Sequence, residues 1–332
     1  MVLKNYRTLT STQSYDGTAS TITTDLPRDF LIQRIILDFH GVTTLGGTSV
    51  LVTNALLRCV KNIRIKAVGE GSSRTLVDIK GEDLYYLNLF DYGFGTALDN
   101  TDTTATAHTQ MTGWTIDMRI AKDNPDDFSV SIPSYLLSTL QLEIEYDTSA
   151  NGYGTNVTTQ AFTMGITLIE GIPEPSESFA KNPLMPLLQK QLSSDSSTGD
   201  QDFDTFFTVG SLIRRSFLLV QTSASAPSDT ELTSYTVQSG QIPLMSKINY
   251  RANKTKDVEN YRIAENPSGF WDVTGYTMID FANNMQPFVP TASGLKVDGL
   301  STIGYNVGDL KITMNRAVAS AIFRRTQESV EG

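Results

Sequence analysis

Leu140-Gln-Leu-Glu-Ile-Glu-Tyr146 alternates apolar and polar residues without interruption. Successive side chains of a β-strand point to opposite faces of the sheet, so a period of two is typical of a strand with one face on a core. Leu310–Met314 and Asn62–Val68 show the same alternation. Phe30–Phe39 and Ala161–Ile169 are denser in apolar residues, which predicts more deeply buried strands. Segments with helical spacing are few, and the chain is therefore predicted to be all-β.

A change in composition near the middle of the chain predicts a boundary between two domains. Prolines are concentrated there, at Pro173, Pro175, Pro183 and Pro186. They precede the polar run Ser193–Asp200, which has little to bury in a core. We interpret residues 173–202 as a linker between an N-terminal domain, residues 1–172, and a C-terminal domain, residues 203–332. Leu184–Leu192 has apolar residues near helical spacing and predicts one short helix within this linker.

The two halves of the chain resemble each other. Three pairs of segments match in the same order: Leu31–Arg34 with Leu212–Arg215, Lys61–Lys66 with Lys247–Arg251, and Leu137–Ile144 with Val307–Met314. A repeat of about 170 residues indicates duplication of a whole domain, and chance similarity between alternating strands is the alternative. Each half offers about eight strands separated by polar insertions, with Phe203–Val209 among the strands of the second half. The predicted architecture is two tandem jelly-roll β-sandwiches with a short linker helix.

Composition places the chain among soluble globular proteins, with 39% hydrophobic and 19% charged residues. The net charge of −10 argues against non-specific binding of nucleic acid, which needs clustered Lys and Arg, and we expect no sequence-specific binding of nucleic acid either. Cys59 is the only cysteine, so no intrachain disulfide can form, and its apolar neighbours predict a small buried hydrophobe. Met1–Arg7 lacks the apolar core of a signal peptide, and no apolar run approaches the length of a membrane span. We expect a chain that is neither secreted by that route nor membrane-spanning.

Residues that could carry catalysis are sparse. His40 and His108 are the only histidines, and we interpret the first as a structural or edge residue and the second as solvated. Asp123–Asp127 and the aspartates of 195–204 could supply oxygen ligands to Ca²⁺, but they lack the spacing of an EF-hand, so a structural Ca²⁺ is unsupported and we interpret both as solvated loops. Nothing selects a carboxylate pair for glycoside hydrolysis. We therefore expect no enzyme, no cofactor and no metal site.

The clustered aromatic residues could form either a binding surface or part of the core. Tyr and Phe in Asp83–Tyr92 could form a sugar-stacking face, but their aliphatic neighbours favour a core or a subunit interface. Trp114 and Trp271 occupy comparable places in the two halves, and each is interpreted as a core anchor.

The segment Arg316–Arg325 is the one concentrated basic feature. The repeat makes it a last strand that corresponds to the segment ending at Ile169. The alternative is a short amphipathic helix, with its arginines free to meet anionic lipid or nucleic acid.

Three segments of the first half, Phe30–Gly41, Asn54–Gly69 and Asp83–Asn88, together resemble the first jelly roll of double jelly-roll major capsid proteins. That family comes from tailless icosahedral, membrane-containing bacteriophages and related viruses of the adenovirus-like lineage. With the second copy, the resemblance covers about residues 20–325. It rests on architectural patterns and not on an invariant motif.

The resemblance implies a homotrimer whose six jelly rolls form a pseudo-hexameric capsomer of an icosahedral shell. The implied partners are neighbouring capsomers, penton proteins and minor capsid proteins, and the implied location is the virion capsid after assembly in the host cytoplasm. In many relatives an internal membrane lies beneath the shell, and the termini face it. On that basis we expect basic residues near both ends to face anionic lipid, namely Lys4, Arg7, Arg316, Arg324 and Arg325.

Two other classes of protein fit the same strand pattern. A carbohydrate-binding or adhesive β-sandwich protein would need solvent-facing aromatic residues or a calcium site in its loops. An enzyme on a jelly-roll scaffold comes third, because no catalytic constellation supports it.

Overall fold

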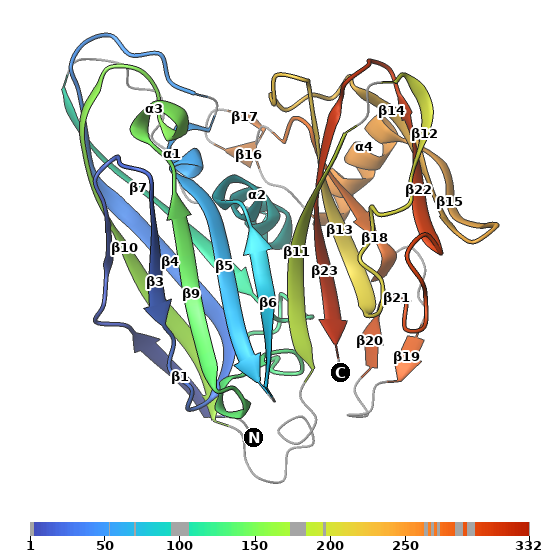
Figure 1. The fold of residues 1–332 in the computed structure, drawn as a ribbon, viewed down its shortest axis with the longest axis horizontal. Coiled ribbons are helices and arrows are strands. Elements are labelled where there is room, and N and C mark those ends of the chain that lie inside the picture. Colours follow the sequence, from blue (N-terminus) through green and yellow to red (C-terminus); the bar gives the residue numbers. More distant parts are fainter. Residues whose placement is uncertain are drawn as a thin grey trace. The chain divides into compact units, whose positions relative to one another are not determined.

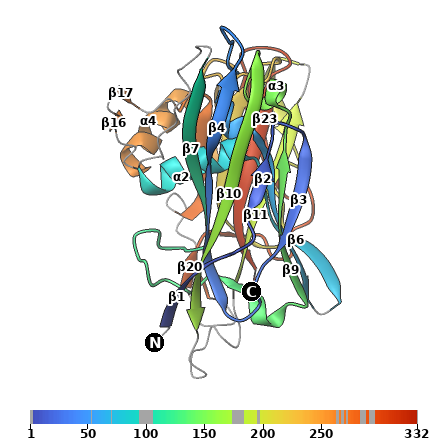
Figure 2. The same ribbon diagram turned by 90° about the vertical axis from the view of Figure 1, so that its left-hand side faces the viewer.

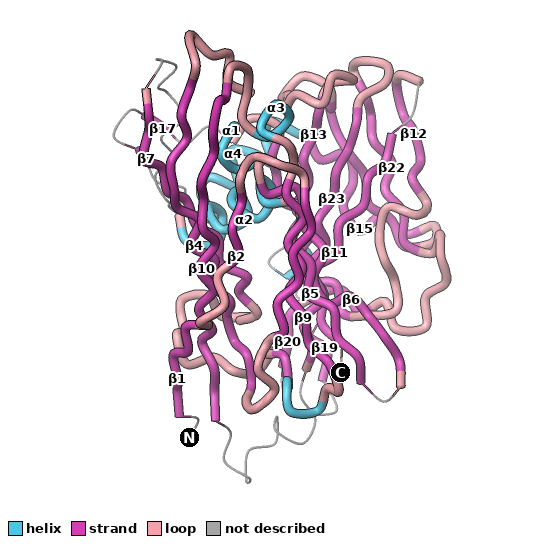
Figure 3. Tube along the Cα trace, turned by 60° about the vertical axis from the view of Figure 1, so that its left-hand side comes forward, coloured by secondary structure: helices cyan, strands magenta, loops and turns pink. Residues whose placement is uncertain are grey.

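The computed structural model describes residues 3–52, 54–69, 71–93, 106–172, 184–194, 197–261, 265–266, 269–270, 273–282, 288–290 and 296–331. Contacts divide the chain into two compact units. Unit 1 comprises Met1–Leu89 and Gly95–Met185, and unit 2 comprises Phe90–Phe94 and Pro186–Gly332. Strands dominate both units, as Figure 3 shows by colour, so the all-β prediction is confirmed.

Unit 1 contains two antiparallel sheets that share a core (Figures 1 and 2). The first, called the β4 sheet, has the order β1-β10-β4-β7, formed by Leu3–Thr8, Val157–Ile172, Leu31–Leu45 and Ala107–Asp117. Short strands β2 (Gln13–Tyr15) and β8 (Ile132–Pro133) pair with β10 and β4. The second, called the β5 sheet, has the order β3-β9-β5-β6, formed by Ser20–Asp25, Thr139–Tyr146, Val60–Gly69 and Ser72–Ile79. The helices are α1 (Ala55–Arg58), α2 (Gly81–Tyr92), α3 (Ser149–Gly152) and the 3₁₀ turn Ser134–Leu136.

The core of unit 1 is built on the aromatic ring of Phe39, from the middle of β4. Its centroid lies 4.7 Å from that of Phe162 on β10 and 6.0 Å from that of Trp114 on β7. Tyr146, on β9 of the facing sheet, lies 6.2 Å away. Because alternate residues of a strand share a face, these rings meet between the two sheets. Trp114 is 1% exposed, which confirms its prediction as a core anchor.

Unit 2 repeats this plan. Its first sheet, called the β13 sheet, has the order β11-β23-β13-β18, formed by Met185–Ser194, Ile322–Glu331, Leu212–Gln221 and Tyr276–Asp280, with β21 (Leu300–Ser301) beside β13. Its second, called the β14 sheet, has the order β12-β22-β14-β15, formed by Gly199–Phe203, Leu310–Arg316, Leu232–Ser239 and Ile242–Asn249. Helix α4 spans Tyr250–Tyr261, and two short hairpins pair Glu265–Asn266 with Gly269–Phe270 and Phe288–Pro290 with Lys296–Asp298.

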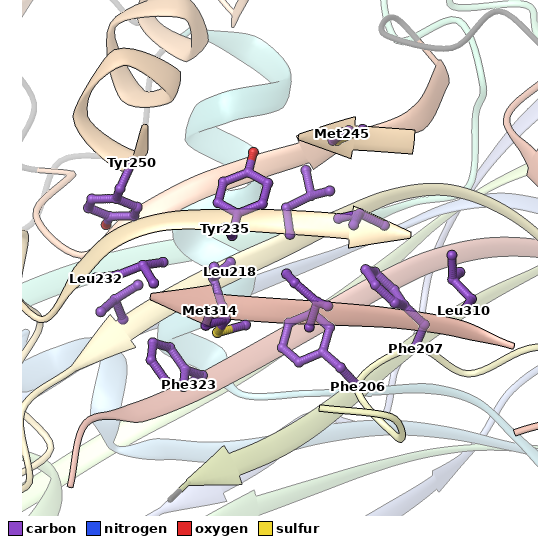
Figure 4. Close-up of a cluster of buried hydrophobic side chains, with 14 of the residues drawn as sticks. Phe206, Phe207, Leu218, Leu232, Tyr235, Met245, Tyr250, Leu310, Met314 and Phe323 are labelled. Carbon is purple, nitrogen blue, oxygen red and sulfur yellow. The ribbon is translucent and has the colours of Figure 1, made fainter. Parts of the chain in front are cut away.

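The core of unit 2 is a second apolar cluster, drawn in Figure 4. Met314 on β22 and Tyr235 on β14 face Leu218 on β13 and Phe323 on β23 across it. All four are at most 2% exposed.

Comparison of the two units confirms the duplication strand by strand. The β4 sheet corresponds to the β13 sheet, with β1, β10, β4 and β7 in the places of β11, β23, β13 and β18. The β5 sheet corresponds to the β14 sheet, with β3, β9, β5 and β6 in the places of β12, β22, β14 and β15. The matches of Leu31–Arg34 with Leu212–Arg215 and of the β9 segment with the β22 segment are therefore correct. The match of Lys61–Lys66 with Lys247–Arg251 is wrong, because β5 corresponds to β14, whereas Lys247–Arg251 ends β15 and begins α4. The fold is two tandem jelly rolls.

The linker prediction needs correction. Leu184–Leu192 forms most of strand β11 and not a helix, because its backbone pairs with β23 in the β13 sheet. A short apolar run does not distinguish a helix from a strand by its spacing alone, and Pro186 is tolerated near the start of a strand. Most of strand β12 also lies within the predicted linker, so both strands belong to the second jelly roll. Residues 173–183 lie outside the described part of the chain.

Two further segments differ from their predicted form. The strand expected at Phe203–Val209 is wrong, since β12 ends at Phe203 and adjacent residues Phe206 and Phe207 both point into the core, at 0% and 4% exposure. Adjacent residues of a regular strand cannot share a face, so a turn is required there. Arg316 ends β22 and Ile322–Arg325 begins the last strand, β23, so the helix is wrong and the strand alternative is confirmed for the end of this segment.

Candidate functional site

Part of the outward-facing side of the β4 sheet is exposed in the described part of the chain. Along β4, Asp38 and His40 alternate with buried Leu37 and Phe39, and both side chains are 54% exposed. His40 Nδ1 lies 2.9 Å from Asp38 Oδ2. Met111, paired with His40 from β7, is 62% exposed on the same side. Of the two alternatives for His40, a structural residue or an edge residue, the second is wrong, because β4 lies between β10 and β7.

The edge strand of the β4 sheet is capped by helix α2. The side-chain amide of Asn88 donates to the carbonyl oxygen of Thr115 at 2.7 Å, and its oxygen accepts from the Thr115 N–H at 2.7 Å. Thr115 lies on β7, at the end of the sheet order. An unpaired strand edge invites pairing with another chain, and Asn88 removes one pair of backbone groups from that edge.

Helix α4 caps the matching edge strand in unit 2. Asp257 Oδ2 accepts from the Met278 N–H at 2.8 Å and from the Thr277 hydroxyl at 2.6 Å, while the Asn253 amide donates to the Met278 carbonyl at 2.9 Å. Asn88 and Asp257 each lie seven residues after the first residue of their helix. The duplication therefore includes the helix side chain that caps the sheet edge.

Burial raises the pKa of Asp257 to about 7.

Replacing Asp257 with asparagine is expected to make stability less dependent on pH. The folded-state pKa is raised above the ordinary value of 3.8, so the unfolded chain releases its proton first and the wild-type protein loses stability as pH rises toward 7. Asp257→Asn keeps the acceptor oxygen and lacks this titration. The unfolding free energy of the variant minus that of the wild-type protein should therefore increase by up to about 1.4 kcal/mol for each pH unit between 3.8 and about 7. Urea titrations between about pH 4 and pH 8 measure it, and a constant difference would contradict the assignment.

The predicted basic residues of the C-terminal stretch are buried. Arg316, Arg324 and Arg325 are 2%, 5% and 1% exposed. Arg325 donates to Gln327, and to Thr208 Oγ1 at 3.2 Å, and burial lowers its pKa to about 9. The prediction that these three arginines face lipid is wrong for this reason. Arg324 and Arg325 lie inside a strand whose two faces are both covered. The alternation of neighbouring residues in the sequence does not reveal that both faces are covered.

The two N-terminal basic residues lie in unit 1 and are partly exposed. Lys4 Nζ lies 2.6 Å from Asp126, and its side chain is 20% exposed. Arg7 is 29% exposed and pairs with Asp29 at 2.8 Å and with buried Glu170 at 3.0 Å. Their role toward lipid stays a prediction.

A group of ionised side chains crosses the outward face of the β5 sheet. Arg64 on β5 donates to Glu143 at 2.8 Å and to Glu145 at 3.0 Å on neighbouring β9, and Lys61 and Lys66 pair with the same glutamates. The hydrogen bond from Lys61 is the main cause that lowers the pKa of Glu145 to about 2. Cross-strand pairs of this kind fix the register of neighbouring strands. The alternation of apolar and polar residues that predicted β5 and β9 also predicts that their charged side chains share the outward face of the sheet.

A buried ion network lies in unit 2. Arg215 on β13 lies 2.6 Å from Asp91, at the end of α2, and 2.5 Å from Glu328 on β23. Arg214 lies 2.6 Å from the other oxygen of Glu328. The arginine side chains are at most 9% exposed. Buried charges need such partners, and the sequence analysis missed this group because its members are far apart in the chain.

The two acidic segments serve as caps and ion-pair partners in the described residues, and the interpretation of 195–204 as a solvated loop is wrong where Asp200 and Asp202 lie in strand β12. Asp127 accepts from the backbone N–H groups of Ile120 and Ala121, at 3.1 and 2.9 Å. Asp202 accepts from Thr313 and lies 3.1 Å from Lys311. Among the residues that the structure describes, no group of three His, Cys, Asp or Glu side chains is placed to hold a metal ion. Asp195 and Trp271 lie outside the described residues.

The remaining sequence predictions fall on single residues. Cys59 is fully buried, as predicted, and burial raises its pKa to about 12. His108 lies within β7, not in a loop, and its Nε2 is 3.1 Å from the Thr106 hydroxyl. Asp83–Tyr92 forms α2, and its described side chains are largely buried, which excludes a sugar-stacking face there. In the described part of the chain, no helix is long and apolar enough to cross a bilayer.

One cavity of about 500 Å³ opens beside α4 in unit 2. Its lining includes Tyr235, Met245, Lys247 and Lys256. It contains mixed polar and apolar groups without a cluster of titratable residues suited to acid–base chemistry.

Comparisons with known proteins find similarity in structure and not in sequence. No family model and no curated protein matches the chain. The major capsid protein of STIV, the Sulfolobus Turreted Icosahedral Virus, matches with a TM-score of 0.76 at 15% identity, over 98% of this chain and 97% of that chain. The major capsid protein from bacteriophage PM2 matches with a TM-score of 0.58 at 12% identity, over 99% and 98% of the two chains. The double jelly-roll fold of this chain is thus the fold of these viral capsid proteins.

Proposed function

We propose that this chain is the major capsid protein of an icosahedral virus and acts as a structural protein of the virion capsid, not as an enzyme. It assembles as a homotrimer, in which six jelly rolls form a pseudo-hexameric capsomer. Capsomers then tile the shell together with penton and minor capsid proteins.

The observation that carries the proposal is the strand-by-strand duplication. Two jelly rolls of equal topology and different sequence allow a three-fold trimer to fill a site with six neighbours, while each roll still presents its own surface. Similarity to the STIV and PM2 capsid proteins over nearly their whole length supports the same reading. The capped sheet edges support it too, because closed edges prevent uncontrolled strand pairing at the high local concentration of a shell.

Native mass tests the proposal directly. Size-exclusion chromatography with light scattering should give three times the 36.4 kDa chain mass, and electron microscopy should show pseudo-hexagonal particles or shells. A stable monomer that binds glycans would contradict the proposal and support a carbohydrate-binding β-sandwich instead. We also propose an internal membrane beneath the shell, which Lys4 and Arg7 would face. Arg316, Arg324 and Arg325 are buried and do not contribute to that contact.

A further inference from the structure

The cavity beside α4 has a buried polar group in its wall. Tyr235 on β14 lines the cavity and is 2% exposed, and its hydroxyl makes no hydrogen bond within the described part of the chain. The ring belongs to the apolar cluster of unit 2, and Figure 4 shows its hydroxyl oxygen directed away from Leu218 and Met314. A buried hydroxyl without a partner is costly. This side chain therefore suits a hydrogen-bond acceptor that the chain itself does not supply.

Two lysines, and no Asp or Glu, line the cavity in the described part of the chain. Lys247 is exposed and forms no ion pair with the described residues, and Lys256 is partly buried. The same lining includes the apolar side chains of Leu244, Met245 and Ile248. The chain as a whole has a net charge of −10, so a cavity with cations alone is a local exception that favours an anion.

A β-bulge in β15 shapes the wall of the cavity. Tyr235 on β14 pairs with Ile248 on β15. Two residues further along β14, Val237 pairs with Met245, which lies three residues from Ile248. The extra residue falls beside Lys247, whose backbone has a positive φ of 47°. A bulge bends its strand and redirects a side chain, and here that side chain is a lysine of the cavity wall.

The matching place in unit 1 carries an aliphatic side chain. Ile63 on β5 pairs with Ile144 on β9, as Tyr235 pairs with Met314 on β22. Since β5 and β9 correspond to β14 and β22, Ile63 holds the place of Tyr235, and it is buried. Strand β6 pairs with β5 at this place without an extra residue.

The neighbouring helices differ in the same way. Counted from the residue that caps the sheet edge in each helix, Leu84 and Leu87 of α2 hold the places of Asn253 and Lys256 of α4. Both leucines are buried, whereas Asn253 and Lys256 line the cavity. Where unit 1 has three buried apolar side chains, unit 2 thus has a hydroxyl, an amide and an ammonium group around one cavity.

We propose that this cavity binds a small amphiphilic anion, with its carboxylate held by Lys247, Lys256 and the Tyr235 hydroxyl. The aliphatic body of the ligand packs against Leu244 and Met245. The volume of about 500 Å³ lies within the range of small-molecule sites, which combine apolar walls with a few placed polar groups. All of these residues belong to unit 2 of one chain, so the inference goes beyond the proposed capsid function and does not depend on the trimer.

Octanoate is the probe, and methionine methyl NMR of the full chain is the readout. Met245 lines the cavity, and its ¹³C-methyl signal is the one that Met245→Leu removes. Octanoate should move this signal with a dissociation constant of about 0.1–1 mM. The signal of Met164, buried in the core of unit 1, should stay in place. 1-Octanol has the same body without the charge and should bind at least about tenfold more weakly.

Variants of the polar groups test their roles. Tyr235→Phe, and Lys247→Gln combined with Lys256→Gln, should each weaken octanoate binding by about tenfold. The Tyr235 hydroxyl has no partner in the described chain, so Tyr235→Phe should leave the unfolding temperature of the ligand-free chain unchanged. A purely structural hydroxyl would give the opposite pattern. Lys311→Gln removes a lysine of unit 2 that does not line the cavity, and this matched control should keep the affinity.

Three results would overturn the inference. These are a Met245 signal that does not move at about 10 mM octanoate, 1-octanol binding as tight as that of octanoate, or full affinity in both variants. If the lysine double variant does not fold, Tyr235→Phe and the comparison with 1-octanol still decide. Native mass reports on the trimer and these titrations report on the cavity, so either proposal can fail without the other.

Discussion

Replacing Arg215 with methionine is expected to lower the free energy of unfolding of unit 2 by about 3–5 kcal/mol. The substitution leaves Asp91 and Glu328, whose side chains are 3% and 16% exposed, without their shared cation. Removing one member of a buried ion pair costs more than the pair contributes, because the remaining charge stays desolvated. Arg214 compensates in part, since it also pairs with Glu328.

Urea titration followed by circular dichroism measures this loss. Lys311→Met is the matched control, because it breaks a pair with Asp202 whose side chains are 24% and 51% exposed, and such pairs contribute about 0–1 kcal/mol. Adding Asp91→Asn and Glu328→Gln to Arg215→Met should regain part of the stability. Equal losses in the Arg215 and Lys311 variants would contradict the buried network.

Replacing Trp114 with alanine is expected to destabilise unit 1 by about 3–5 kcal/mol. The ring is 1% exposed beside Phe39, so its removal leaves a cavity between the sheets. The indole N–H also donates to the carbonyl oxygen of Gly81 at 2.7 Å, and that buried acceptor would lose its partner.

Trp114→Phe separates the two contributions. Phenylalanine fills most of the volume and cannot donate, so it should lose about 1–3 kcal/mol, and the rest of the alanine effect is the cavity. Urea unfolding followed by circular dichroism measures both variants. A loss below about 1 kcal/mol for Trp114→Ala would show that the sheets close over the space, contrary to the expected cost of a cavity.

The predictions that held were those in which a local pattern reports a local structure. Strict alternation in Leu140–Tyr146 places one face of β9 on the core and the other in solvent, so the period of two identified the strand. The match of Leu31–Arg34 with Leu212–Arg215 is correct because it begins equivalent strands of the two jelly rolls. The predicted resemblance also agrees with the fold.

The predictions that failed concern residues whose surroundings come from distant parts of the chain. Leu184–Leu192 is a strand because β23, more than a hundred residues later, pairs with it. Packing over both faces of β23 buries Arg324 and Arg325, which composition alone presents as a basic surface. A single sequence reports the charge of a residue but not the elements packed over it.

The sequence by itself therefore determined the strand periodicity, the duplication and the all-β class, because side-chain alternation is a property of neighbouring residues. Tertiary structure alone decided which arginines are buried, which of them has a counter-charge and which helix residue caps each sheet edge. Those features depend on contacts between elements far apart in the chain. Arg215 and Arg34 make the point, since they end matching tetrapeptides and differ only in what the fold brings beside them.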